Sequence, residues 1–188
     1  MEIIENQDFK KVSAAKLRSS GTTFENCSFE YCDFADADLS NLTFIDCRFS
    51  DCNLSLSRIF KTSFQNIKFS NCKLSGTDFS KSSDFLFEVS FDHCLLDNAI
   101  FYQKKNKGAT FSDCSLTETD FTEADLSNAM FDHCNFNRAF FDRTQLKGAD
   151  LSTSYNFIID PDLNSIKKAK FSVHGLAGLL AKYDIVIK

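Results

Sequence analysis

The 188-residue chain has no tryptophan, one proline and no apolar run long enough to span a membrane, which takes about 20 residues. Its N-terminus, residues 1–5, lacks the basic start and apolar core of a signal peptide. Basic residues are not in excess either: the formal net charge is −5, which argues against nonspecific binding to nucleic acid. We therefore expect one cytoplasmic domain that contacts neither membrane nor nucleic acid directly.

Motifs of catalysis are missing as well. The sequence has no CxxC, no G-x-S-x-G, no H-E-x-x-H and no phosphate-binding P-loop. These absences leave no starting point for an active site, so we expect neither an enzyme nor a bound cofactor.

Phenylalanine, by contrast, occurs 22 times, and part of it recurs at a fixed interval. Seven phenylalanines are spaced by 20 residues, with one interval of 22: Phe9, Phe29, Phe49, Phe69, Phe91, Phe111 and Phe131. Six of the eight cysteines follow the same rule: Cys32, Cys52, Cys72, Cys94, Cys114 and Cys134. In both sets the interval lengthens from 20 to 22 residues at the same place, which predicts a chain that repeats one structural unit along its length.

The 20-residue interval divides into fives. From Phe24 to Phe79, and again from Leu86 to Leu151, every fifth residue is large and apolar except Asn106. Neither a helix of period 3.6 nor a strand of period 2 gives this spacing. A chain that turns a corner every five residues does, and four such sides make one square coil. In each side the central residue and the residue two before it point inward.

The repeats resemble the pentapeptide-repeat family, whose loose motif is A(D/N)LxX. Good copies are Ala37–Asn41, Ala124–Asn128 and Ala149–Thr153, and the resemblance covers about residues 22–153. It implies an all-β fold, a right-handed quadrilateral β-helix of about seven coils. Residues 1–153 would form this solenoid, including its first coil. Residues 154–188 of the same domain would add an irregular last coil and a C-terminal helix and strand.

All eight cysteines, with Cys27 and Cys47 added to the six above, fall on the inward position two before a centre. Stacked coils lie roughly 4.8 Å apart, which is within reach of a disulfide. Stacked thiols point the same way, however, and a reducing compartment keeps them free. We expect small buried side chains rather than disulfides or a metal site.

Two short segments break the repeat. Residues 80–88 carry the two-residue insertion, which predicts a bulge at a corner with Leu86 back at an inward centre and Phe85 and Phe87 facing out. These two phenylalanines would cover the bulge or contact a partner. Residues 104–108 read Lys-Lys-Asn-Lys-Gly. Either Asn106 points inward and the coil stays in register, which we favour, or the corner opens into a basic loop.

The C-terminal residues predict a helix with one apolar face, followed by a short strand at residues 184–188. That face consists of Val173, Leu176, Leu179, Leu180 and Tyr183. It would cap the solenoid, pair two chains, or do both. Residues 176–187 are similar to the ending of the Qnr quinolone-resistance proteins, whose members bind DNA gyrase or topoisomerase IV as mimics of duplex DNA. The resemblance implies a homodimer through this helix and a topoisomerase partner.

Two outward surfaces are candidates for the partner contact. Side 2, the side centred on the spaced phenylalanines, is the most acidic, and its acidic candidates are Glu30, Asp51, Asp92, Asp113 and Asp132. Side 4, centred on Leu39, Ile59 and their equivalents, carries the aromatic candidates Phe60, Tyr102 and Phe140. A solvated face explains the acidity equally well, and scattered apolar residues are an alternative for side 4.

The outward histidines His93 and His133 would lie two coils, or roughly 10 Å, apart, so that they do not share one metal ion. The sequence predicts a non-enzymatic rod, and the resemblance to the Qnr proteins implies that this rod binds a type II topoisomerase. The alternative is a protein-interaction scaffold with an unrelated partner and no effect on topoisomerases.

Overall fold

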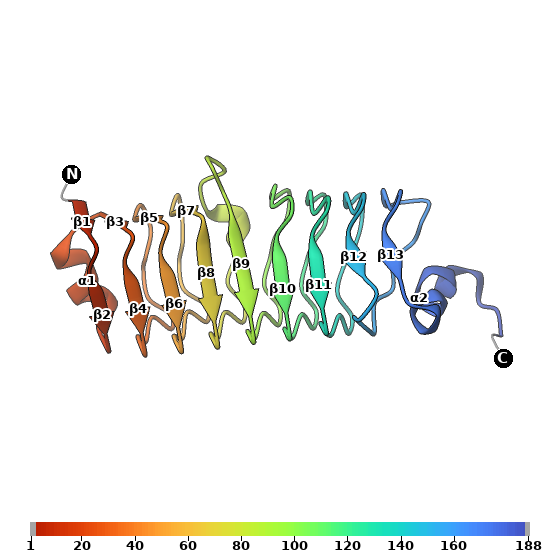
Figure 1. Ribbon diagram of the computed structural model, residues 1–188, viewed down its shortest axis with the longest axis horizontal. Helices are drawn as coiled ribbons and strands as arrows, with labels where there is room; N and C mark the ends of the chain where they lie inside the picture. Colours follow the sequence, from red (N-terminus) through yellow and green to blue (C-terminus); the bar gives the residue numbers. More distant parts are fainter. Residues whose placement is uncertain (1–2, 187–188) are drawn as a thin grey trace.

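The computed structural model describes residues 3–186, which form a rod of stacked coils with its two ends far apart (Figure 1). Side 2 is one parallel sheet of nine strands. In spatial order from the N-terminal end these are β2 (Asp8–Lys10), β4 (Ser28–Glu30), β6 (Arg48–Ser50), β8 (Ile67–Ser70), β9 (Val89–Asp92), β10 (Thr110–Ser112), β11 (Met130–Asp132), β12 (Asp150–Leu151) and β13 (Lys170–Phe171). Nine strands enclose eight turns, one more than predicted, because residues 152–171 complete a further coil.

A second, four-stranded parallel sheet lies on the adjacent side and covers the first coils only. It contains β1 (Ile3–Glu5), β3 (Thr23–Glu25), β5 (Thr43–Ile45) and β7 (Ser63–Gln65). The other two sides are joined by single bridges such as Asp33↔Asn53 and Ile100↔Asp120. Each pairing outside the insertion joins residues 20 apart, so the sequence interval is the circumference of one coil. The predicted β-helix is confirmed.

Left-handed residues make the corners. In the second coil Asn26, Tyr31, Asp36 and Asn41 have φ between 51° and 61°, at intervals of five residues. Asparagine and aspartate tolerate this conformation better than most side chains. The chain can therefore turn four times per coil without glycine at every corner.

The axis of the rod is filled by phenylalanine rings. Rings one coil apart stack, as Phe29 and Phe49 do with centroids 4.6 Å apart, and rings on adjacent sides meet edge to face, as Phe24 and Phe29 do at 5.8 Å. All eight cysteines are free and buried beside this column. The Cys52 thiol, for example, donates to the carbonyl oxygens of Phe29 and Ser50, both 3.3 Å away.

The N-terminal coil departs from the prediction on one side. Residues Ala14–Ser20 form a helix, α1, where the sequence predicted part of the first coil. Ser13 caps the helix by accepting from the Lys16 N–H, and Leu17 alone of the helix is fully buried. Alanine, lysine, leucine and arginine are good helix formers, and an end coil has a neighbour on one side only. The helix propensity of these residues therefore outweighs the repeat pattern, and this side of the first coil is helical.

The insertion forms a loop that projects from one edge of the rod after a short 3₁₀ helix, η1 (Phe79–Lys81) (Figure 1). The prediction that Leu86 returns to the core is wrong: its side chain is exposed and its φ is 53°. Phe87 turns inward instead and meets the Phe79 ring edge to face at 6.2 Å. The residue that faces outward beside Leu86 is Phe85.

The basic repeat at 104–108 stays in register, as favoured, through the bridge Lys105↔Asp125. Asn106 points inward and bonds both backbone groups of Val89, N–H at 3.2 Å and C=O at 3.0 Å. Lys104 is also buried, which was not predicted. Its ammonium donates to the carbonyl oxygens of Ser82 (2.8 Å) and Ser83 (3.4 Å) in the loop.

The C-terminal segment is helical from η2 (Val173–Gly175) through α2 (Leu176–Leu180) to η3 (Ala181–Tyr183). It rests on residues 157–162: the Ile159 N–H donates to the Gly178 carbonyl (3.1 Å), and the Lys182 ammonium bonds Asp160 (2.6 Å) and Asp162. The predicted strand at 184–188 is not seen at residues 184–186; residues 187–188 lie outside the described part. Asp184, in the left-handed conformation, ends the helix.

Candidate interaction surfaces

The acidic candidates of side 2 lie in two neighbouring columns along the sheet. Asp92 and Asp132 are the last residues of β9 and β11, and Ser112 lies in register between them. Asp113 is the corner residue after β10. Glu30 and Asp51 belong to earlier coils. The structure therefore brings three of the five acidic candidates together over the coils of β9 to β11.

Counter-charges divide the face further. Glu30 lies 3.3 Å from the Lys10 ammonium, and Arg48 of β6 and Lys68 of β8 are paired in register on the same sheet. The pKa of His93 is raised above its usual value, first by its hydrogen bond to Asp92 and then by the charges of Asp92 and Asp113. The acidic surface is thus confined to one stretch of the rod.

The three aromatic candidates on side 4 are all exposed, but they do not form one patch. Phe60 lies two coils before Tyr102 and four before Phe140, roughly 10 and 19 Å along the axis at the strand spacing. Phe60 lines an apolar groove of about 510 Å³ with Leu56, Arg58, Gly76 and Lys81. Tyr102 and Phe140 lie outside this groove.

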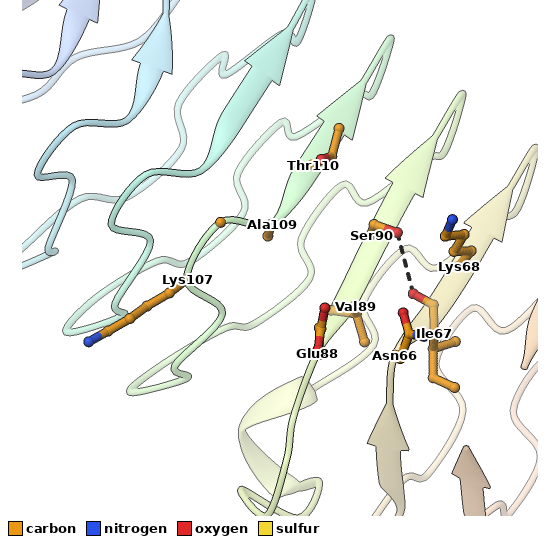
Figure 2. Close-up of a pocket in the computed structure, with 10 residues that line it drawn as sticks. Asn66, Ile67, Lys68, Glu88, Val89, Ser90, Lys107, Ala109 and Thr110 are labelled. Carbon is orange, nitrogen blue, oxygen red and sulfur yellow. Dashed lines mark hydrogen bonds between the residues drawn. The ribbon is translucent and has the colours of Figure 1, made fainter. Parts of the chain in front are cut away.

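A second hollow, of about 280 Å³, lies where the insertion displaces the chain (Figure 2). Lys68 of β8, Val89 and Ser90 of β9 and Thr110 of β10 line it, and the Ser90 hydroxyl contacts the Ile67 carbonyl at 3.5 Å. Lys107 extends away from it toward Asp125, 3.2 Å from its carboxylate. Its lining also holds Glu88, but the bond of the Ser90 hydroxyl is to a backbone carbonyl and not to this carboxylate.

The predicted dimer surface at the C-terminus is divided by the fold. Val173, Leu176 and Tyr183 are exposed, whereas Leu179 and Leu180 are half-buried against their own chain. One face of the helical segment therefore caps the coil, and the other leaves apolar side chains in solvent.

Sequence reasoning missed the polar network around Lys104. The signal was present, because Lys104 stands at the inward position two before Asn106, where other repeats hold cysteine, alanine or threonine. The lysine's ammonium also lies 4.7 Å from the Phe87 ring centroid and 2.7 Å from an oxygen of Asp84.

A stack of coils that are paired through parallel strands around one continuous buried core defines a β-solenoid. Residues 22–83 and 85–155 match the model of the pentapeptide repeat region, and the chain belongs to the pentapeptide-repeat family. Comparison with curated proteins gives no match.

Three solved structures are similar to this chain. Two are trypsin-treated forms of QnrB1, a plasmid-mediated fluoroquinolone resistance protein. One is 21% identical with a TM-score of 0.51 and covers 99% of each chain. The other is 20% identical with a TM-score of 0.50 and covers 99% of this chain and 98% of that one. The third is HetL of the cyanobacterium Nostoc, involved in heterocyst differentiation regulation: 14% identical, TM-score 0.32, covering 86% and 88%.

Over residues 3–186, no helix has the length and apolar character that crossing a bilayer requires.

Proposed function

We propose that this protein acts by binding rather than by catalysis, and that its partner is a type II topoisomerase, DNA gyrase or topoisomerase IV. The observation that carries the proposal is the match to QnrB1 along 99% of both chains, which includes the C-terminal end as well as the coils. QnrB1 is a fluoroquinolone resistance protein. Because fluoroquinolones act on type II topoisomerases, a protein that confers resistance to them is expected to bind such an enzyme.

The acidic stretch of side 2 supports a contact that resembles duplex DNA. Asp92, Asp113 and Asp132 are exposed at the edge of a flat sheet, and successive coils hold them roughly 4.8 Å apart along the axis. DNA carries one charge per about 1.7 Å of axis, so this stretch is sparser than DNA. The contact would therefore combine this charge with apolar side chains, for which Phe60, Tyr102 and Phe140 are the candidates.

Plasmid supercoiling by gyrase, with and without a fluoroquinolone, tests the proposal. Added protein should inhibit supercoiling or restore it in the presence of the drug. A variant with Asp92→Asn, Asp113→Asn and Asp132→Asn should need at least a tenfold higher concentration, whereas Glu30→Gln, already paired with Lys10, should behave as wild type. No effect of the wild type on gyrase and topoisomerase IV of the same host at tens of micromolar would refute it.

We also propose that two chains pair through the exposed face of the C-terminal helix. Val173, Leu176 and Tyr183 leave apolar surface in solvent at the end of the rod, and a second copy would cover it. Size-exclusion chromatography with light scattering should give a dimer for the wild type and a monomer for Leu176→Asp. Met130→Asp, an exposed apolar position on β11, serves as the control and should remain dimeric. A monomeric wild type would exclude the dimer.

A scaffold with an unrelated protein partner is the second candidate, and the groove beside Phe60 favours it. The exposed surface of the groove is mainly apolar, and of its three charged lining residues Arg58 and Lys81 are basic and Asp78 is acidic, which suits an apolar segment of another protein that carries a negative charge. If topoisomerases do not respond, affinity capture from host extract should retain one protein with the wild type and lose it with Phe60→Asp. Retention of that protein by Phe60→Asp would argue against this groove.

A further inference from the structure

His93 is held between two carboxylates on neighbouring coils. Its Nδ1 lies 2.9 Å from an oxygen of Asp92, and its Nε2 lies 3.7 Å from an oxygen of Asp113. One ligand atom from each of the three residues can be chosen so that all lie within 4.8 Å of one another. Because Asp92 holds Nδ1, the orientation of the imidazole ring is fixed, and its Nε2 points toward Asp113.

The backbone fixes this arrangement. His93 and Asp113 are both corner residues with φ of 52° and 51°, and they follow β9 and β10, which are paired in register through Phe91↔Phe111. The His93 N–H donates to the Ser112 carbonyl at 2.9 Å, next to Asp113. The two side chains therefore leave the rod side by side, one coil apart, from a rigid sheet.

The same motif recurs two coils later without its second carboxylate. Asp132 lies 2.9 Å from His133 Nδ1, as Asp92 does from His93. The residue 20 positions after His133 is Thr153, however, and its hydroxyl donates to Asp132 at 2.8 Å and accepts from the His133 N–H at 3.0 Å. The chain thus contains two aspartate–histidine dyads. Asp113 lies one coil from each histidine, but among the described residues it comes within ion-pair distance of His93 only.

We propose that Asp92, His93 and Asp113 form a binding site for a divalent cation of the zinc class. Nε2 of His93 and the Asp113 carboxylate are the ligands, and Asp92 accepts a hydrogen bond from Nδ1–H, which fixes the tautomer of the neutral ring and leaves the Nε2 lone pair for the metal. Two ligands at about 2.1 Å in tetrahedral geometry are about 3.4 Å apart, so the observed 3.7 Å requires only a small rotation of an exposed aspartate. The positions left open take water or a side chain of a partner.

The ligand set also sets the selectivity. One imidazole with carboxylate suits zinc, whereas magnesium prefers oxygen ligands alone and keeps its waters. The eight cysteines, the strongest competing zinc ligands, are buried, and their thiols donate to backbone carbonyls, as those of Cys52 and Cys72 do. The folded rod therefore offers zinc this surface site rather than its thiols.

Isothermal titration of the untagged, folded protein with ZnCl₂ tests the site, and NMR of the imidazole nitrogens locates it. We expect one site, a shift of His93 Nε2, and at least tenfold weaker binding for His93→Ala and Asp113→Asn. His133→Ala should bind as wild type, and MgCl₂ at the same concentration should give no shift. Circular dichroism checks that each variant keeps the fold.

Two outcomes would overturn the proposal. The first is no zinc binding by the wild type at 1 mM. The second is an equal loss of binding in His93→Ala and His133→Ala, which would mean that an isolated dyad suffices and that Asp113 is not a ligand. Because neither experiment involves a topoisomerase, the outcome is independent of the proposed partner.

Discussion

At the scale of single residues, the inward position two before each centre takes either a small apolar side chain or a hydroxyl that can bond the backbone. Four threonines show the second solution: Thr62, Thr77, Thr119 and Thr144 each donate to the carbonyl oxygen 23 residues earlier, at 2.8–2.9 Å. Ser57 is the exception among the described residues, because its buried hydroxyl has no hydrogen-bond partner. A buried hydroxyl without a partner loses its water and gains nothing in return.

Ser57→Ala should therefore leave the free energy of unfolding unchanged or raise it by up to about 1 kcal/mol, since alanine fits the equivalent positions Ala99 and Ala139. Thr77→Ala is the control, and it should lower stability by about 1 kcal/mol through the lost bond to Leu54. Urea unfolding followed by circular dichroism measures both. A clear loss of stability in Ser57→Ala would show that the hydroxyl is satisfied in solution.

Lys104, unlike Ser57, is a buried polar side chain whose hydrogen bonds are made. Its ammonium satisfies two carbonyls of the inserted loop, and its side chain is 2% exposed. Lys104→Met keeps most of the volume but leaves these carbonyls unpaired, so stability should fall by about 2 kcal/mol. Asp84→Asn should cost less than about 1 kcal/mol because Asp84 is 87% exposed. Hydrogen exchange of residues 82–88 should quicken in Lys104→Met; equal, small effects of the two variants would contradict this account.

At the scale of elements, the C-terminal helix is positioned by two glycines. A Cβ on Gly178 would lie 2.0 Å from the Phe157 carbonyl oxygen, which is backbone, whereas one on Gly175 would meet the tip of the Phe157 ring at 2.5 Å. The first contact cannot be relieved unless the helix moves, and the second can be relieved by the ring.

Gly178→Ala should consequently detach the helix, with a stability loss of about 2 kcal/mol or more, and Gly175→Ala should cost less. Limited proteolysis reads out the detachment: cleavage within residues 173–184 should be faster in Gly178→Ala only. Unchanged proteolysis in that variant would mean that the helix does not need this close approach.

The elements also divide into those that periodicity predicts and those that it does not. Along residues 22–79 and 89–151 each coil stacks between two others, so a centre such as Phe49 can only point inward, and the five-residue spacing predicts its place. In the insertion, loop closure rather than spacing decides which of Phe85, Leu86 and Phe87 turns in. At the ends, where a coil has one neighbour, local helix propensity produces α1 and the described C-terminal residues form no strand.

The candidate surfaces were predictable to a similar degree. Knowing that Asp92 and Phe60 face outward requires only the phase of the repeat, and the structure places both in solvent. To predict which residues lie beside Asp92 and Phe60 on the next coils, one must also know the register between coils, including the two-residue shift. His93 and Asp113 both follow the insertion and align at the ordinary interval of 20 residues, whereas the shift lies between Phe60 and Tyr102 and makes their separation 42 residues, or two coils.

At the scale of the whole molecule, the rod is a linear array in which each coil touches only the next. Its eight buried thiols are distributed from Cys27 to Cys134 and report on opening along the array. Burial raises the pKa of the Cys47 thiol to about 12, which leaves almost no thiolate at neutral pH.

A thiol reagent should therefore leave all eight cysteines unmodified in the native protein and modify all eight in denaturant. In mild denaturant, Cys27 in the second coil should react before Cys94 in the middle, because an array opens from its ends. Mass spectrometry of peptides gives the order. Simultaneous modification of the two would indicate that the rod unfolds as one cooperative unit, and rapid labelling without denaturant would contradict the burial.

The buried pairing of Lys104 with residues 82–84 has a consequence for how the chain finds its alignment. Most coils here are interchangeable in outline, phenylalanine above phenylalanine, so a folding chain could skip one full circuit and still stack its rings. Such a shift would leave the lysine's charge beside a coil that lacks the inserted loop, whose Ser82 and Ser83 carbonyl oxygens accept from it here, and burying it there would be costly. The pairing of Lys104 with the inserted loop thus fixes which coil stacks on which, and it sets the register of all the other coils.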